Sequence, residues 1–216
     1  MSKDLLIILA WPEGMTTAAG AWYDKCFAKN GKYRVGHSAL VLVNSTTRKF
    51  HYFDFGRYHT PVGFGRIRDL ETDPDISINQ LAEISNNQIT NITQILLEIY
   101  NNEACHGEGK LYASVVSKVN FSNAFNYAKK WQNKGAIPYG PFILQGTNCS
   151  RFVASVARKA VGSYIIKLRL RFPFCLSPSP KRNVAIGNKN YYVVRDGNCT
   201  KIDRGVIKAY FSSIEI

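Results

Sequence analysis

The sequence predicts an α+β fold in which one helix packs on an antiparallel sheet. The first observation is a pair of β-rich runs within residues 36–55, separated by a polar turn, which is the pattern of a hairpin. The second is a helical pattern that begins abruptly at Cys149, after a segment broken by Gly and Pro. No internal repeat or low-complexity segment divides the chain, so we expect a single domain over residues 1–216.

The first strand is expected at Leu5–Trp11, an apolar run that is too short to cross a bilayer. A membrane span needs roughly 18 to 20 apolar residues. The run also lacks the basic segment and the cleavage site of a secretory leader. We therefore expect a cytoplasmic protein. Residues 16–29 then predict a helix, whose core contacts would be Trp22, Cys26 and Phe27.

Hairpin geometry places His37 on the same face as Asp54. The predicted strands cover residues 36–43 and 49–55, and a loop of two or four residues puts His37 directly opposite Asp54. Opposite residues on antiparallel strands share a face, with Cβ atoms about 5 Å apart. A loop of three or five residues would instead move the two side chains to opposite faces. A His–Asp pair on adjacent strands can fix the imidazole tautomer, although both side chains could also simply bond backbone.

The remaining elements follow from periodicity and turn signals. Residues 56–75, rich in Gly and Arg, predict a long functional loop. Cys105 and His106 are adjacent and their side chains diverge, so we expect a polar loop there. The other expected elements are a helix from Asn91, a strand at 110–117, a helix from Ser122 to Gln132, an extended run at 164–174, and strands at 184–186, 190–194 and 199–202.

Cys149 lies in the first turn of its predicted helix, which Thr147 or Asn148 caps and Gly162 ends. Unpaired backbone N–H groups and the positive end of the helix dipole favour a thiolate at this position. The position is typical of a nucleophilic cysteine, and the alternative is a small buried hydrophobic residue. The same helix face carries Phe152, Val153, Val156 and Ala160.

The composition excludes several classes of function. The formal net charge is +13, but the Lys and Arg residues are spread along the chain and form no nucleic-acid motif, so we do not expect nucleic-acid binding. The five cysteines form no CxxC pair, which argues against a disulfide framework and against zinc. We expect neither a metal nor another cofactor.

All four histidines precede Cys149, so a cysteine nucleophile with a histidine base requires the chain order His, acid, Cys. In this hypothesis Cys149 attacks a carbonyl carbon, His37 takes the thiol proton, and Asp54 orients His37. The backbone N–H of Cys149 would hold the oxyanion. The candidate oxyanion and supporting side chains are Tyr139, Gln145 and Asn148.

Two segments resemble a known family. Tyr139–Gly140 followed by Asn148–Val153 resembles the nucleophile motif of NlpC-type cysteine peptidases, which reads Asp-Cys-Ser-Gly-Phe-Val with a tyrosine upstream. Gly36–Ala39 resembles their histidine strand, and its position before the cysteine matches the circularly permuted branch. The resemblance implies a papain-like fold and a thiol-dependent peptidase or amidase. Asn148 and Arg151 depart from the motif, where the family has an acidic residue and a glycine.

Two classes of function stay open from the sequence. One is a hydrolase or acyltransferase that acts on an amide or ester bond, with cell-wall-type peptides as a candidate substrate. The other is a non-catalytic binding domain on the same fold, which uses its basic and aromatic loop. Arg57, Arg66 and Arg68 would line the cleft entrance, and because arginine forks suit carboxylates we expect an anionic, peptide-like substrate.

Overall fold

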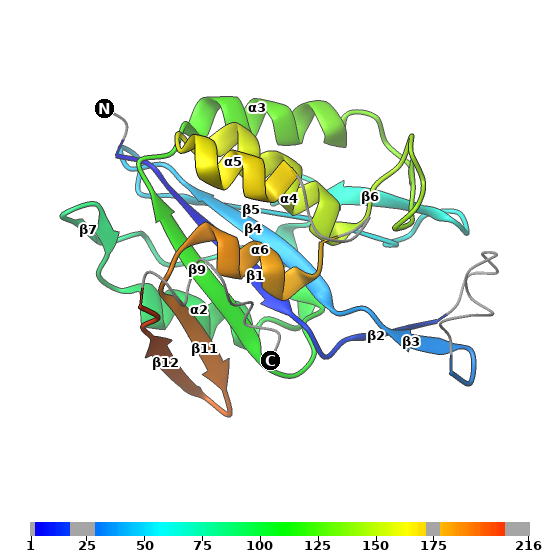
Figure 1. The fold of residues 1–216 in the computed structure, drawn as a ribbon, viewed down its shortest axis with the longest axis horizontal. Coiled ribbons are helices and arrows are strands. Elements are labelled where there is room, and N and C mark those ends of the chain that lie inside the picture. The colour runs from blue at the N-terminus through cyan, green and yellow to red at the C-terminus, as the bar shows by residue number, and fades with distance from the viewer. Residues whose placement is uncertain (1–2, 18–28, 172–177, 206–216) are drawn as a thin grey trace.

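The computed structural model describes residues 3–17, 29–171 and 178–205, and its centre is an eight-stranded antiparallel sheet (Figure 1). The α+β class is therefore confirmed. The strand order is β10-β6-β5-β4-β1-β9-β11-β12. The bounds are β1 Leu5–Trp11, β4 His37–Val43, β5 Phe50–Gly56, β6 Phe64–Arg68, β9 Leu111–Ser117, β10 Ile137–Pro138, β11 Tyr191–Arg195 and β12 Asn198–Ile202. Two small ribbons pair β2 Met15–Thr17 with β3 Lys32–Arg34, and β7 Ile84–Ser85 with β8 Gln88–Ile89.

Helices cover both faces of the sheet (Figure 1). One face carries α3 Phe121–Gln132, α4 Cys149–Ala160 and α6 Pro180–Gly187, while α5 Tyr164–Arg171 packs against α4 and α6. The other face carries α2 Ile92–Asn101, and the short 3-10 turns are Pro74–Ile76 and Glu103–Cys105.

Strand β1 separates the two cores, and all seven of its residues are buried. Successive strand residues point to opposite faces. Leu6, Ile8 and Ala10 therefore join the core under α4, while Leu5, Ile7, Leu9 and Trp11 join the core over α2. This is why the strand is apolar at every position.

The β4–β5 hairpin places His37 and Asp54 on the same face, as predicted, but its register differs from the predicted one. Val43 pairs with Phe50 and Ala39 pairs with Asp54, so the connecting loop has six residues. The expectation that His37 lies directly opposite Asp54 is therefore wrong by two positions. Because the side-chain period of a strand is two, this even shift leaves both residues on one face. His37 begins β4, at the end of the sheet where β5 finishes.

Other predicted elements are partly corrected. The loop at residues 56–75 contains a strand, β6, and the run at 164–174 forms α5 as far as Arg171. Residues 184–186 lie in α6, which Ser179 caps, and are not a strand. Most of the helix expected at 16–29 falls outside the described residues, and Met15–Thr17 is a strand. The strands at 111–117, 191–195 and 198–202 and the helices α2 and α3 are confirmed, with α3 capped by Asn120 and not by Ser122.

A buried ion pair joins β5 and β6 near the end of the sheet where β4 begins. Asp54 on β5 and Arg68 on β6 are cross-strand partners. Arg68 donates from Nε to Oδ1 of Asp54 at 3.0 Å and from Nη2 to Oδ2 at 2.7 Å. Asp54 is 0% exposed and Arg68 is 2% exposed. The pair is bidentate and buried, which is the geometry in which an arginine–carboxylate contact is strongest.

We expect Arg68→Ala to lower the free energy of unfolding by about 3–5 kcal/mol, because it leaves a buried carboxylate without its main countercharge. Arg66→Ala is the matched control, since Arg66 pairs with the partly exposed Asp73 and such a pair is worth about 1 kcal/mol or less. Urea titration followed by far-UV circular dichroism measures both. Equal losses in the two variants would contradict this account.

Candidate active site

The start of α4 positions Cys149. Asn148 is the N-cap, and its side chain accepts a hydrogen bond from the backbone N–H of Arg151 at 2.9 Å, so one of the two predicted caps is confirmed. Asn183 donates to the carbonyl of Ser150 at 2.8 Å and ties the first turn to α6. Cys149 is therefore the first helical residue, and it is 5% exposed. Its sulfur lies where the helix end favours negative charge.

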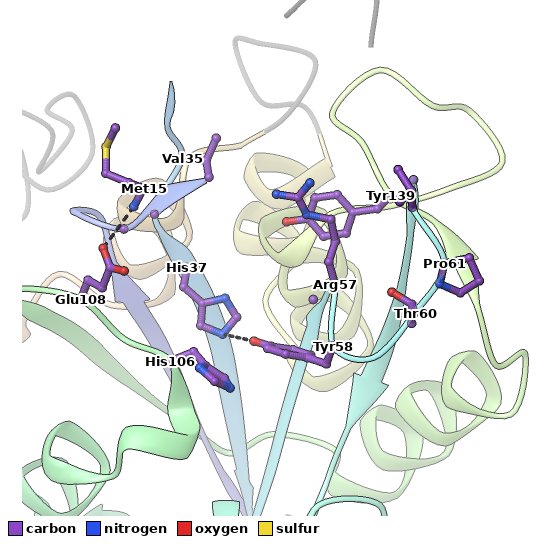
Figure 2. Close-up of a pocket in the computed structure, with 15 residues that line it drawn as sticks. Met15, Val35, His37, Arg57, Tyr58, Thr60, Pro61, His106, Glu108 and Tyr139 are labelled. Carbon is purple, nitrogen blue, oxygen red and sulfur yellow. Dashed lines mark hydrogen bonds between the residues drawn. The ribbon is translucent and has the colours of Figure 1, made fainter. Parts of the chain in front are cut away.

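Two neighbours hold the imidazole of His37. Its Nε2 donates to Oδ2 of Asp54 at 3.0 Å, and the ring stacks on the indole of Trp11 with 5.8 Å between centroids. The hydroxyl of Tyr58 donates to the same Oδ2 at 3.0 Å and lies 3.4 Å from Nε2 (Figure 2). Since Asp54 occupies Nε2, the other ring nitrogen is left for Cys149, whose thiol is close enough for the two groups to shift each other's pKa. The structure thus brings Cys149, His37 and Asp54 together.

The electrostatics of the three groups favour an ion pair between Cys149 and His37. Burial lowers the pKa of His37, but hydrogen bonds and negative charge from Asp54 and Cys149 outweigh burial and raise the pKa to about 9. Burial raises the pKa of the Cys149 thiol, yet His37, Ser150 and Tyr139 together hold that pKa below its ordinary value. Both shifts act in the direction that favours a thiolate beside an imidazolium.

Asp54 stays ionised although it is fully buried. Burial raises its pKa, but the hydrogen bonds from His37 and Arg68 lower the pKa to about 2. The hydroxyls of Tyr58 and Tyr52 also donate to Oδ2, at 3.0 and 3.3 Å. Four residues thus donate five hydrogen bonds to the carboxylate, as a buried charge requires.

Tyr139 is a further neighbour of the sulfur. Its hydroxyl donates toward Sγ of Cys149 at 4.0 Å, and its ring stacks on Phe55 with 5.3 Å between centroids. The phenol therefore lies next to the thiol. Gln145, the other side chain expected here, is exposed and is not among the residues that line the cleft.

A cleft of about 690 Å³ opens above His37. Figure 2 shows Arg57 and Tyr139 on one wall, and Met15 and Glu108 across from them. The guanidinium of Arg57 lies 5.6 Å from the centroid of the Tyr139 ring. The carboxylate of Glu108 accepts the backbone N–H of Met15 at 3.2 Å. One wall therefore carries a cation and the other an anion.

Only one of the three arginines expected at the entrance lines this cleft, namely Arg57. Arg66 forms two 2.6 Å bonds to Asp73 and donates to the carbonyl of Tyr58. Arg68 is buried against Asp54, with its guanidinium 3.6 Å from the centroid of the Tyr58 ring. The expectation for Arg66 and Arg68 is wrong because both lie on β6 and not in a loop.

Sequence reasoning missed the residues around Cys149, His37 and Asp54. His106 stacks on Tyr58 at 5.2 Å and lines the cleft with Glu108, so the polar-loop interpretation of this segment was incomplete. A Cβ atom on Gly107 would overlap the indole of Trp11, so only glycine lets the loop approach so closely. Gly107 was the one local feature of the sequence that could have indicated this close contact. Trp11 and Tyr58 gave none, because their contacts come from distant elements.

The described residues form neither a metal-binding cluster nor a membrane-spanning helix. No group of three His, Cys, Asp or Glu side chains within residues 3–17, 29–171 and 178–205 could hold a metal ion. None of the helices in that part of the chain is long and apolar enough to span a membrane.

The fold and this site can be compared with known proteins. The crystal structure of the type VI secretion system effector TseH superposes with a TM-score of 0.63 at 19% identity, covering 93% of this chain and 98% of that one. The curated proteins include no match. The family model of TseH-like type VI secretion system effectors matches residues 6–166. The chain therefore belongs to the family of TseH-like type VI secretion system effectors.

Proposed function

We propose that the protein is a cysteine hydrolase that cleaves an amide bond in a peptide, on a papain-like fold of the permuted NlpC type. The observation that carries the proposal is a buried thiol at a helix N-terminus beside an imidazole that Asp54 holds in one orientation. In chain order the histidine hairpin precedes the cysteine helix, as the permuted branch requires.

The reaction follows the usual sequence for a thiolate nucleophile. Sγ of Cys149 attacks the carbonyl carbon, and the C–N bond breaks as His37 gives its proton to the leaving amine. His37 then takes a proton from water, whose oxygen attacks the thioester and releases Cys149 and the acid. The backbone N–H of Cys149 and the hydroxyl of Tyr139, which lies 4.0 Å from Sγ, would stabilise the oxyanion. An amine or alcohol in place of water would make the same site an acyltransferase.

Family membership supports a role outside the producing cytoplasm. TseH is described as a type VI secretion system effector, and we propose that this chain is likewise exported by such a system. The expectation of a cytoplasmic protein would then hold only for its site of synthesis. Cell-wall-type peptides are the proposed substrate, since they combine amide bonds with free carboxylates that Arg57 could bind.

Cys149 should react with iodoacetamide at pH 6.5 faster than Cys105, because burial raises the pKa of Cys105 to about 12. His37→Ala should remove this advantage, whereas Asp54→Asn should reduce it less. Peptide mapping by mass spectrometry gives each rate. Equal rates for the two cysteines, unchanged by His37→Ala, would leave only the binding-domain alternative.

Release of fragments from purified peptidoglycan should depend on Cys149 and His37. Cys149→Ala should abolish release, and His37→Ala should slow it about 10²–10⁴-fold through loss of the general acid and base. Chromatography of the soluble products measures the rates. A normal rate in Cys149→Ala would refute the proposal, whereas an inactive wild type that still alkylates rapidly would show that the substrate is a different amide.

The pH profile should reflect the raised pKa of His37. The rate should stay level through neutral pH and fall above about pH 9, where His37 loses its proton. The same raised pKa means that His37 stabilises the fold below pH 6.5 and that this contribution is lost as pH rises through 9. Thermal unfolding at each pH therefore serves as the control. Asp54→Asn should move the alkaline limb to lower pH, and an unmoved limb would count against the assignment.

Arg57→Gln should raise KM for peptides with a free carboxylate near the scissile bond and leave neutral peptides nearly unchanged. Arg66→Gln is the matched control, since Arg66 is bound to Asp73 and does not line the cleft. Steady-state kinetics on a pair of acidic and amidated peptides tests this. The same change in KM for both peptides would rule out charge recognition by Arg57.

A further inference from the structure

The positive charge of the protein is concentrated in one half of the chain. Residues 109–195 contain fifteen Lys and Arg residues and no Asp or Glu. This segment includes α3, α4, α5 and α6, which together cover one face of the sheet (Figure 1). These helices therefore carry many Lys and Arg residues, and their own segment supplies no carboxylate to neutralise the positive charge.

The outermost helix of this layer, α5, exposes apolar side chains between cations. Ile166 and Leu170 turn toward the core. Tyr164, Ile165 and Leu168 face solvent with exposed fractions of 75%, 59% and 44%. Leu168 follows Ile165 by three residues and Tyr164 by four, so all three lie on one side of the helix. Lys167 and Arg169 flank that side in the sequence.

A second cavity lies next to this apolar side. Its volume is about 580 Å³, and Tyr164 and Leu168 are part of its lining. Four cationic side chains also line it, namely Arg158, Lys159, Lys167 and Arg171. None of these residues lines the cleft above His37, so the two sites are separate. Cations that converge without a carboxylate in the lining favour a phosphate-bearing ligand.

We propose that the α5 face binds the surface of a bilayer that contains anionic phospholipid. Tyr164, Ile165 and Leu168 enter the boundary between headgroups and acyl chains, and the cations of the adjacent cavity hold lipid phosphates. This combination of an apolar ridge and flanking cations is the arrangement by which interfacial helices bind membranes. Exposed aliphatic side chains favour lipid over nucleic acid, whose backbone offers them no apolar partner.

Cosedimentation of the full chain with vesicles tests this binding. One vesicle is phosphatidylcholine alone, and the other contains about one quarter phosphatidylglycerol. The wild type should bind the anionic vesicles and not the neutral ones. The triple variant R158Q/K159Q/K167Q should bind about a hundredfold more weakly, since each cation near the surface contributes about 1 kcal/mol. The variant I165S/L168S should lose at least tenfold, through its apolar contacts alone.

The matched control is K29Q/K32Q/K201Q, which removes the same charge from exposed lysines of β12 and of the segment at residues 29–32. It should lose much less affinity than the α5 triple variant. Circular dichroism and Cys149 alkylation check that every variant is folded. The proposal is overturned if the wild type binds neither kind of vesicle, if the two triple variants lose equal affinity for the anionic vesicles, or if I165S/L168S binds them as tightly as the wild type. A DNA oligonucleotide that binds more tightly than the anionic vesicles, and equally well to wild type and I165S/L168S, would identify nucleic acid instead.

Discussion

The buried carboxylate of Asp54 is the group on which the rest of the site depends. At 0% exposure, a lone carboxylate would protonate or would destabilise the fold. Arg68 binds it from β6 and His37 binds it from β4, while Tyr52 and Tyr58 complete its hydrogen bonds. One ion therefore links three neighbouring strands and fixes the direction of the imidazole.

The two cationic partners of Asp54 have different consequences. The Arg68 guanidinium stays protonated, so Asp54 keeps a countercharge when His37 loses its proton. His37 can then gain and lose a proton without neutralising its own partner. Cys149 comes from a different layer, and it meets His37 at the end of the sheet where β4 begins. The site thus joins one end of the central strands to a helix terminus.

The hairpin, the α4 start and the pairing of His37 with Asp54 could be predicted from sequence, because each depends on local periodicity. The face of a strand residue survives any even shift in register, so the pair was found although the loop is longer than expected. The cations at alternate positions of α5 have the period of a strand, which is why an extended run was predicted there. The helical face is defined by the contacts of Ile166 and Leu170 with the core, which the sequence alone does not show. Trp11 and His106 join the site from elements distant in the chain, which no local pattern can reveal.

The stacking of Trp11 on His37 has a spectroscopic consequence. An imidazolium in contact with an indole quenches indole emission, whereas a neutral imidazole quenches it far less. Trp11 is almost fully buried, and Gly107 packs closely against its indole. The part of the emission that comes from Trp11, one of three tryptophans in the chain, should therefore report the proton on His37 without substrate or label.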